Sequence, residues 1–491
     1  MVVSLVLLWV CFCMLLFLIR TRRPKHFPPG PQTIPIFGNL HQLNLVNPVN
    51  DLQKLSDRYG KVFSFYFGGR PAVIITGMEA MREALLTKAL DFAGRPGGVL
   101  LSHLTQGKGI IMADYGPSWK EHRRFALITM RNFGLGKQSM EERILGEVSY
   151  ICAHLEKVAG QTIDPQTLFH NASCDIICSI MFGSRYEYDH EFFQAMIKMM
   201  ADNSKIANGP WGMIYDTMPL LRNLPLPFQS AVRDYHTVKM HVLDIVNEHR
   251  ATRTPNEPRD LIDGYLDEVD KRGQDPAPFD DSQMLTMLLD LLFAGTDTTS
   301  NTIRAAVLYF MAYPDIQERC QQEIDMVLEG RDQLCFEDRH SMPYTQAVIH
   351  ETQRAASTLP LSVFHCTTKD TELTGYQIPK GTLVIQNLSS VLHEETQWKF
   401  PHSFNPNNFL NEQGEFEKPP AFMPFSIGPR TCLGEGLARM ELFLILVTLL
   451  RRFQFIWPED AGEPDFTPVF GVTQAPKPYK MVVKPRTITA N

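Results

Sequence analysis

Most of the chain has the pattern of helix, and short strand-like runs occur near its beginning and in its last third. Runs rich in β-branched and aromatic residues, 62–67 and 72–76, flank a turn at 67–71 and indicate a hairpin. Strand and turn patterns return at 371–392. The apolar tracts 284–293 and 442–450 are too short to span a bilayer, so we expect buried core helices there. The segments expected to be helical are 79–89, 116–130, 140–159, 169–182 and, longest of all, 281–313. Together these elements predict a mainly α fold with small β-sheets, in the α+β class.

The N-terminal segment 1–19 carries no charged side chain, and a basic cluster, Arg20, Arg22, Arg23 and Lys25, follows directly. About twenty apolar residues in a helix cross the hydrocarbon of a bilayer, and basic residues on one flank hold that side in the cytoplasm. We therefore expect 1–19 to be a single transmembrane anchor. A cleaved signal peptide is the alternative, but its positive charge would precede the apolar stretch, and no small-x-small cleavage site stands before Arg20.

Prolines follow the basic cluster, in the sequence Phe27-Pro28-Pro29-Gly30-Pro31. Because proline fixes φ and prevents a helix from continuing, residues 20–31 are predicted to form a stiff, basic and proline-rich hinge. No Gly/Ser-rich linker, charge block or repeat divides the remainder. Residues 32–491 are therefore predicted to be one large domain.

Composition adds two exclusions. Hydrophobic residues make up 44% and charged residues 21% of the 491 residues, which is ordinary for a globular protein with a large core. The net charge of −7 argues against nucleic acid as a general partner. The nine cysteines are scattered and odd in number, so they indicate a reducing compartment and no disulfide framework.

Cys432 has the surroundings of a metal ligand. It stands two residues after Arg430, between Gly428 and Gly434, and directly before the predicted helix 437–450. The positive end of a helix dipole favours a thiolate, so we expect the pKa of this thiol to be lowered. Only the thiolate is a good metal ligand, and glycines let the backbone pass close to a flat cofactor. The alternative is that Cys432 is a small buried hydrophobe, as isolated cysteines usually are.

This segment resembles the signature of the haem-thiolate cytochrome P-450 monooxygenases, Phe-x-x-Gly-x-Arg-x-Cys-x-Gly, at every fixed position. The matching residues are Phe425, Gly428, Arg430, Cys432 and Gly434. The resemblance implies the cytochrome P-450 fold and iron protoporphyrin IX, haem b, with Cys432 as its metal ligand. Phe425 and Gly434 then belong to the cofactor site, and Arg430 to the donors for a haem propionate.

A polar interruption lies in the middle of the longest predicted helix, in the sequence Ala294-Gly295-Thr296-Asp297-Thr298-Thr299. Small residues there would admit a planar ligand, and a Thr hydroxyl can bond the carbonyl one turn back. In the resembling family this segment crosses the distal face of the haem, where Thr298 would position water and dioxygen and Asp297 would supply protons. An exposed polar helix face is the alternative, but consecutive polar residues cannot all share one side.

Further cofactor contacts come from separate segments. Trp119 and Arg123 are four residues apart, so they share a helix face. The family uses this pair for a haem propionate, and Arg95 and His365 match further propionate donors of its microsomal members. The residue before His365 is usually proline in those relatives and is Phe364 here, which leaves the placement of His365 open.

Glu351 and Arg354 are three residues apart and within pairing reach on one helix face. Alone, this spacing is common on protein surfaces. In the family a Glu-x-x-Arg at this distance from the cysteine forms a buried ion-paired network that braces the haem core. Its third member is often arginine or histidine, whereas this chain offers Asn408, so we expect a weaker network.

The resemblance implies a membrane-bound monooxygenase that inserts one oxygen atom from O2 into lipophilic substrates such as foreign compounds or fatty acids. Electrons would come from NADPH through a separate FAD/FMN reductase, with cytochrome b5 as a second candidate partner, on the cytoplasmic face of the endoplasmic reticulum. Two alternatives stay open: a haem-thiolate isomerase of peroxides, and a non-catalytic haem-binding membrane protein. The expected docking surface comprises Lys120, His122, Arg124, Arg131, Lys137, Arg451 and Arg452. The expected substrate lining comes from 99–112, 192–214, 293–294, 359–363 and 470–472.

Overall fold

The computed structural model describes residues 23–487 except 45, 134–137, 274–276 and 332, together with six separate positions before residue 23. Helices dominate this part of the chain and the strands form small sheets, so the predicted α+β class is confirmed. The predicted anchor, 1–19, falls almost entirely outside the described residues. In the part of the chain that is described, no helix is both long enough and apolar enough to cross a membrane.

The helices agree in type with the sequence pattern, and their ends differ by a few residues. The region 79–89 divides into α3 and a π-helical turn, Glu83–Thr87. The α-helices are α2 Val49–Tyr59, α3 Met78–Arg82, α4 Leu100–Thr105, α5 Pro117–Asn132, α6 Gln138–Lys157, α7 Gln166–Met181, α8 Glu191–Asn208, α9 Pro210–Thr217, α10 Phe228–Thr252, α11 Leu261–Arg272, α12 Asp281–Ala312, α13 Pro314–Val327, α14 Pro343–Ala356, α15 Leu388–Leu392 and α16 Glu435–Arg452. Short 3-10 turns lie at Leu40–Gln42, Pro219–Leu221, Phe336–Ser341 and Pro406–Phe409.

The strands confirm both sheet regions expected from the sequence. The largest sheet has the order β1-β2-β7-β4, with β1 and β2 as the predicted hairpin and β7 parallel to β2. The others have the orders β3-β11-β8, β5-β6 and β10-β9. The strands are β1 Val62–Phe67, β2 Arg70–Ile75, β3 Thr162–Ile163, β4 His365–Cys366, β5 Thr371–Leu373, β6 Tyr376–Ile378, β7 Leu383–Gln386, β8 Phe453–Ile456, β9 Pro468–Val469, β10 Ala475–Pro476 and β11 Met481–Pro485.

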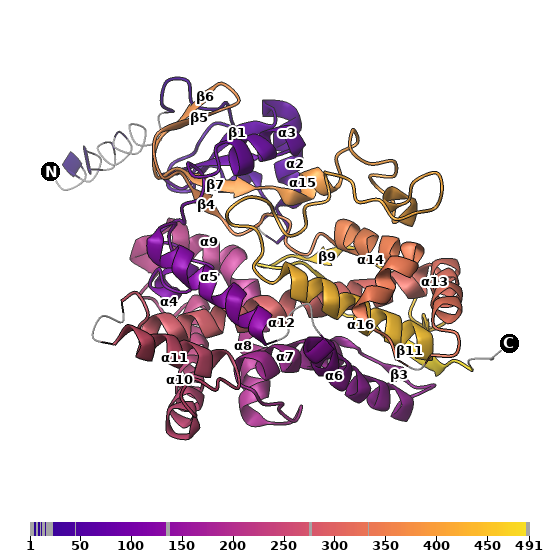
Figure 1. Ribbon diagram of the computed structural model, residues 1–491. Coiled ribbons are helices and arrows are strands. Elements are labelled where there is room, and N and C mark those ends of the chain that lie inside the picture. Colours follow the sequence, from indigo (N-terminus) through magenta and orange to yellow (C-terminus); the bar gives the residue numbers. More distant parts are fainter. Residues whose placement is uncertain are drawn as a thin grey trace.

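Helix α12 runs through the middle of the molecule, with α7 and α16 nearby and the largest sheet lying to one side (Figure 1). The Asp280 side chain accepts the backbone N–H of Gln283 at 2.8 Å and so caps the start of α12. Most of α12 and of α16 is buried, as expected for the two short apolar tracts. Because α12 is covered on most sides, polar residues within it must find partners in the protein.

The described part of the proline-rich segment lies against the largest sheet. The backbone N–H of Ser64 in β1 donates to the carbonyl of Pro29 at 2.7 Å, and Phe27 is buried. The Asn39 side chain donates to the carbonyls of Pro31 and Gln32. These contacts attach residues 27–32 to the folded domain.

Candidate active site

Cys432 lies in a tight loop that leads into α16. Its backbone N–H donates to the carbonyl of Phe425 at 2.9 Å, and Gly434 occupies the position before the first residue of the helix. Gly428 has φ +81, and a Cβ atom there would stand 2.0 Å from the backbone oxygen of Leu85. Glycine is therefore required at 428 because the backbone of Leu85 passes so close to it. The sequence argument had attributed this requirement to the cofactor.

The free thiol of Cys432 does not have the lowered pKa that its place at a helix start predicted. The side chain is accessible to solvent, yet enough protein surrounds it that burial raises the pKa of Cys432 above its ordinary value. The backbone N–H of Gly434 and the charge of Arg123 act in the opposite direction and are weaker. The prediction was wrong because desolvation outweighs the helix end. A bound metal cation is what would favour the thiolate here.

Arg123 and Trp119 lie together on α5 beside the cysteine loop, as predicted. The Arg123 guanidinium donates to the carbonyl of Thr431 at 2.7 Å and lies 5.5 Å from the Trp119 ring centre. The indole N–H of Trp119 donates to the carbonyl of Ile110 at 3.0 Å. In this conformation the indole proton is therefore engaged by the protein backbone, while Arg123 stands next to the thiol.

Arg95, Arg430 and His365 form a basic cluster, in which Arg430 and His365 are buried and Arg95 is half-buried. Arg430 donates to the carbonyls of Ala93 and Ala113 at 2.9 and 2.8 Å, and its Nη1 is buried without a partner among the described residues. Arg95 donates to the carbonyl of Ile111 at 2.7 Å. His365 Nδ1 lies 2.7 Å from the carbonyl oxygen of Phe92, which can only accept, so Nδ1 carries the ring proton.

Phe364 does not displace His365 from this cluster. The backbone oxygens of Val363 and Phe364 each accept a hydrogen bond from Arg95 Nη1 at 2.9 Å. His365 begins β4, which pairs with β7 opposite Val384. The backbone of this segment is therefore held in place by the same arginine that the sequence assigned to the cofactor, and His365 is buried as expected.

The charges of the cluster fit an anionic group such as a haem propionate. Burial lowers the pKa of Arg430 to about 10, and burial together with the charge of Arg430 lowers that of Arg95. Burial and the charges of Arg95 and Arg430 hold the pKa of His365 well below its ordinary value. Buried cationic groups that depress one another are stabilised by a carboxylate placed between them. The unpartnered Nη1 of Arg430 is a donor available for it.

On α12 the Thr298 hydroxyl donates to the carbonyl of Ala294 at 2.7 Å, which confirms the expected bond to the preceding turn. Ala294 and Thr298 are partly exposed, whereas Thr296, Asp297 and Thr299 are buried. The stripe 291, 294 and 298, which lies on one helix face, is partly exposed, and so are the neighbouring Phe293 and Gly295. The alternative of a wholly exposed polar face is wrong.

Two residues of the same segment face α7. A Cβ atom at Gly295 would lie 2.4 Å from the side chain of Ile177, so the small residue at 295 permits close packing of α7 on α12. The Asp297 carboxylate contacts His170 on α7 and the hydroxyl of Thr473. Asp297 directly precedes Thr298 in the chain, but its contacts with His170 and Thr473 are revealed only by the fold.

Asp290 is a site residue that the sequence argument missed. It lies in the apolar tract 284–293, and one carboxylate oxygen accepts the backbone N–H groups of Ile110 at 2.7 Å and Ile111 at 2.8 Å. These residues supply the carbonyls that bind Trp119 and Arg95. Asp290 thus ties α12 to the loop beneath the basic cluster. A charged residue inside an otherwise apolar tract was the available signal.

The replacement Asp290→Asn is expected to change the pH dependence of stability. Burial raises the pKa of Asp290 to about 7, against the N–H groups of Ile111 and Ile110 and the charge of Arg95, which lower it. As pH rises from the unfolded pKa of 3.8, the unfolded chain loses this proton first, so the folded protein is destabilised until pH passes the folded pKa. The free energy of unfolding falls by up to about 4 kcal/mol over this pH range.

Urea unfolding of both proteins across this range measures the effect. The asparagine variant keeps an acceptor oxygen for the two N–H groups and does not titrate, so its stability relative to the wild type should increase with pH. A constant difference would show that the pKa of Asp290 is the same in the folded and the unfolded chain.

Glu351 and Arg354 form a buried network on α14. Nε and Nη2 of Arg354 each lie 2.7 Å from a carboxylate oxygen of Glu351, and both residues are buried. The Asn408 amide donates to both Glu351 oxygens at 3.2 Å, so it takes the third place as predicted. Arg354 also donates to carbonyls at 392, 400, 401 and 403. The pair therefore anchors the segment that precedes the cysteine loop.

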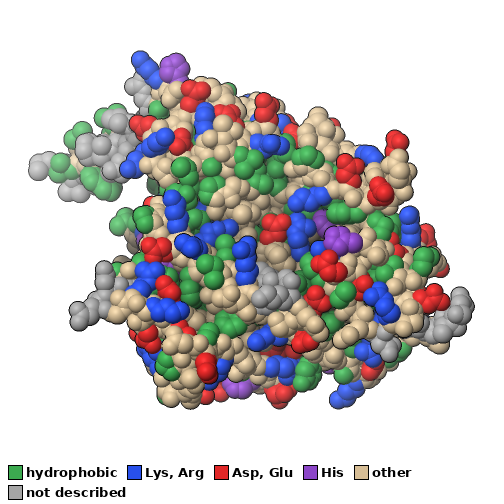
Figure 2. Space-filling view, viewed as in Figure 1, with side chains coloured by type: hydrophobic (Ala, Val, Ile, Leu, Met, Phe, Trp, Pro, Cys, Tyr) green, Lys and Arg blue, Asp and Glu red, His purple; other side chains and the backbone are tan. Residues whose placement is uncertain are grey.

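The basic surface on α5 is smaller than the sequence indicated. Lys120, Arg124 and Arg131 are exposed, and Figure 2 shows basic side chains, interspersed with acidic ones, over the face where α5 lies. His122 is fully buried and lies 3.2 Å from the Tyr265 hydroxyl, so its assignment to the surface was wrong. The helix turns His122 inward because it lies on the face opposite Lys120 and Arg124. Lys137 falls outside the described residues.

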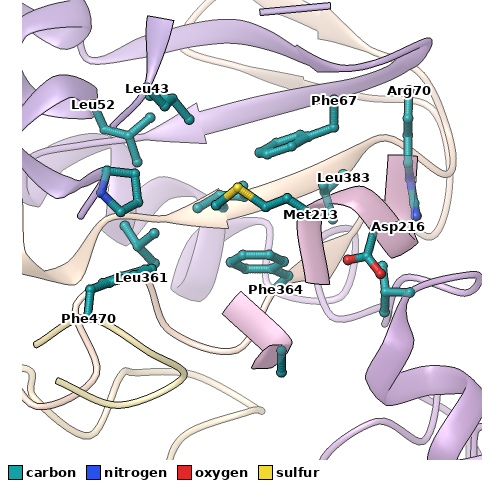
Figure 3. Close-up of a pocket in the computed structure, with 14 residues that line it drawn as sticks. Leu43, Leu52, Phe67, Arg70, Met213, Asp216, Leu361, Phe364, Leu383 and Phe470 are labelled. Atoms are coloured by element: carbon teal, nitrogen blue, oxygen red, sulfur yellow. The ribbon is translucent and has the colours of Figure 1, made fainter. Parts of the chain in front are cut away.

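A mainly apolar pocket lies between α2, the β1-β2-β7 face of the largest sheet and α9 (Figure 3). Several of its residues belong to the segments expected to contact substrate, namely Val99, Ala207, Met213, Leu361 and Phe470. Arg70 and Asp216 form one polar end. Burial raises the pKa of Asp216 to about 7, although the N–H of Leu100 and the charge of Arg70 lower it. An apolar pocket with one polar end is suited to lipophilic molecules.

The chain is similar to known proteins over most of its length. Residues 28–483 match the family model described as Cytochrome P450. The chain is 43% identical over 458 residues to Cytochrome P450 2F2 of Mus musculus, which covers 92% of this chain and 93% of that protein. It is 39% identical over 485 residues to Cytochrome P450 2J2 of Homo sapiens, covering 98% and 96%, and 41% identical over 467 residues to Cytochrome P450 2D3 of Rattus norvegicus, covering 94% and 93%.

Proposed function

The chain belongs to the cytochrome P450 family of haem-dependent monooxygenases, and on that premise we propose that it is a membrane-anchored enzyme that oxidises lipophilic compounds with electrons from NADPH. The electrons would pass through a separate FAD/FMN reductase, because the sequence holds no dinucleotide- or flavin-binding fingerprint of its own. The observation that carries the proposal is the placement of Cys432 in the loop before α16, two residues after Arg430 of the basic cluster that also holds Arg95 and His365.

In this proposal Cys432 is the metal ligand, and Phe425 and Gly434 shape the loop that presents it. Haem bound through a thiolate supplies the activation of dioxygen. Arg95, Arg430 and His365 would hold a propionate by charge and hydrogen bonding. Arg123 and Trp119 would hold the cofactor edge near α5, where Arg123 is already close enough to act on the Cys432 thiol.

Ala294, Asp297 and Thr298 would contribute to the site from α12. The small side chain of Ala294 leaves room beside α12, and the Thr298 hydroxyl is placed on the partly exposed stripe of the helix. A hydroxyl there positions water and accepts or passes on a proton. Asp297 is the nearest acid along the chain and would be the source of that proton.

Localisation and substrate class follow from the N-terminus and the pocket. The uncharged segment 1–19 with its basic flank supports a single-pass anchor in the endoplasmic reticulum membrane, with the remaining chain on the cytoplasmic side. Such an anchor would give the apolar pocket of Figure 3 access to molecules dissolved in the bilayer. Foreign compounds and fatty acids are the expected substrates. The exposed Lys120, Arg124 and Arg131 are proposed to steer an acidic reductase to α5, with cytochrome b5 as a competing partner.

Reconstitution tests this function. The purified full-length protein with the reductase, NADPH and a panel of lipophilic compounds should form oxygenated products, and carbon monoxide should inhibit their formation. Conversion of peroxides without NADPH or dioxygen would indicate the isomerase alternative. A thiolate-type spectrum without turnover of either kind would indicate the non-catalytic one.

Replacing Thr298 by alanine should separate electron consumption from product formation. The variant loses the hydroxyl that positions water and proton on the exposed stripe, so reducing equivalents should be diverted to hydrogen peroxide while the spectrum stays unchanged. Product formed per NADPH consumed is expected to fall by roughly tenfold or more. The variant Thr302→Ala, which removes a hydroxyl one turn further along α12 that bonds the Thr298 carbonyl, is the matched control. Fully coupled turnover in Thr298→Ala would refute the assigned role.

A further inference from the structure

Both carboxylate oxygens of Asp297 are held by residues from other parts of the chain. Oδ1 lies 3.1 Å from Nε2 of His170 on α7, and Oδ2 accepts the hydroxyl of Thr473, which lies just before β10. All three side chains are buried. Asn301, one turn further along α12, donates to the Thr473 hydroxyl at 3.4 Å. The carboxylate is thus turned toward α7, while the neighbouring Thr298 hydroxyl is bonded to Ala294.

The contacts of the His170 ring require an additional proton. Nδ1 lies 3.3 Å from the carbonyl oxygen of Gln166, which can only accept, and Nε2 faces the carboxylate. A neutral imidazole carries one N–H and satisfies only one of these acceptors. Both contacts are made when the ring carries two protons, or when Asp297 carries the second one. In either case the pair holds one proton more than a neutral ring beside a carboxylate.

A buried cation lies near the pair. The Arg304 guanidinium interacts with Asp297 and also with Asp164, and it is bound to Asn301 and to the carbonyl of Pro476. We therefore place the proton on His170 Nε2, with the Asp297 carboxylate as its acceptor, and Asp297 receives the proton when the carboxylate itself has to act as an acid.

We propose that His170 is a positioning residue that stores a proton for Asp297 and, with Thr473, fixes the orientation of the carboxylate. This inference rests on the proposed function of Asp297 as the proton source. When the proton passes from His170 Nε2 to Asp297 Oδ1, the ring becomes neutral and the carboxyl becomes the acid, which turns from α7 to reach Thr298. After that acid has given up its proton, the carboxylate returns to α7 and the imidazole takes one proton from bulk solvent, so His170 and Asp297 regain their starting state.

The chain contains a matched pair of the same geometry in a different place. His249 on α10 lies 2.8 Å from Asp260 Oδ2 through Nε2 and 2.8 Å from the carbonyl oxygen of Ile245 through Nδ1. Burial lowers the pKa of His249, but the bonds to Asp260 and Ile245 outweigh it and leave that pKa raised. This pair caps α11 and is not in contact with the 294–299 segment. His249→Leu therefore controls for the loss of a buried His–Asp pair as such.

The test compares full-length haem-loaded variants with the reductase and NADPH. His170→Leu should reduce the product formed per NADPH roughly tenfold. This loss is smaller than the loss expected when the proton donor itself is removed. His170→Gln keeps an N–H toward Asp297 but has no proton to pass on, so it should restore the thermal stability lost in His170→Leu while the yield stays low. His249→Leu should behave as the wild type.

A second readout does not depend on turnover. Thermal unfolding of His170→Leu, Asp297→Asn and the double variant forms a cycle, in which contacting partners are expected to be non-additive. The double variant should melt at a temperature close to that of the less stable single variant. Additive shifts together with unchanged yield in His170→Leu would overturn the inference. If Asp297→Asn itself leaves the yield unchanged, the proposed role of Asp297 is refuted; if Asp297→Asn uncouples the enzyme and His170→Leu does not, only the role of His170 is refuted.

Discussion

Replacing Cys432 by alanine is expected to abolish the thiolate-type absorption band of the reduced carbon monoxide complex and all monooxygenase turnover. The loop is also closed by the backbone N–H of Cys432, which donates to Phe425, and by the side chain of Arg123, which donates to Thr431, and alanine at 432 keeps both bonds. The polypeptide should therefore fold. What is lost is the only sulfur in the segment that leads into α16, so the metal has no soft ligand there.

The measurement is a reduced carbon monoxide difference spectrum of purified protein, with circular dichroism to confirm the fold. Cys335→Ala is the matched control, because Cys335 is a partly exposed free thiol that lies before the 3-10 turn Phe336–Ser341. The control should retain the band in full. A wild-type protein that purifies colourless despite ample porphyrin supply, or that shows imidazole coordination, would contradict the assignment of Cys432.

Removing the carboxylate of Glu351 should produce the largest loss of stability of any single substitution considered. Arg354 would remain buried with its charge unbalanced, since its other partners are backbone carbonyls. Breaking a buried ion pair by removing one partner destabilises proteins by about 3–5 kcal/mol. Because total stability is typically about 5–15 kcal/mol, Glu351→Ala should fold poorly or release its haem.

Urea unfolding and the haem content of purified protein measure this effect. Glu268→Ala is the control, since Glu268 forms a partly exposed pair with Arg272 at i, i+4 spacing and exposed pairs contribute about 0–1 kcal/mol. Asn408→Ala should fall between the two because it removes a neutral amide from the same carboxylate. A loss for Glu351→Ala no larger than that of the control would show that the pair does not brace the core.

The candidate site shows where sequence reasoning succeeded. Cys432, Arg430 and Thr298 belong to short motifs shared with the resembling family, so their proposed roles could be assigned before the fold was known. The same holds for Glu351 and Arg354, whose spacing places them on one helix turn. Asn408 was expected as a weaker third partner, and the structure bears out its position.

Other features needed the fold. Whether the pKa of the Cys432 thiol rises or falls depends on how much protein surrounds it. The surrounding atoms come from segments that are far apart in the chain. His170 lies 127 positions from Asp297, and no local pattern joins them. Asp290 was hidden in an apolar tract because its partners are backbone N–H groups of another loop, which have no sequence signature.

By itself, the sequence determined the α+β class, the long central helix and the early hairpin, and it singled out Cys432 as the candidate metal ligand. Each depends on interactions over a few residues, and periodicity and motif spacing record such interactions directly. The tertiary structure decided which way the polar side chains face, with His122 inward to Tyr265 and the carboxylate of Asp297 toward α7, and it placed the backbone of Gly295 against Ile177. Burial and partner choice are set by helices brought together from far apart in the chain, so no local pattern could have given them.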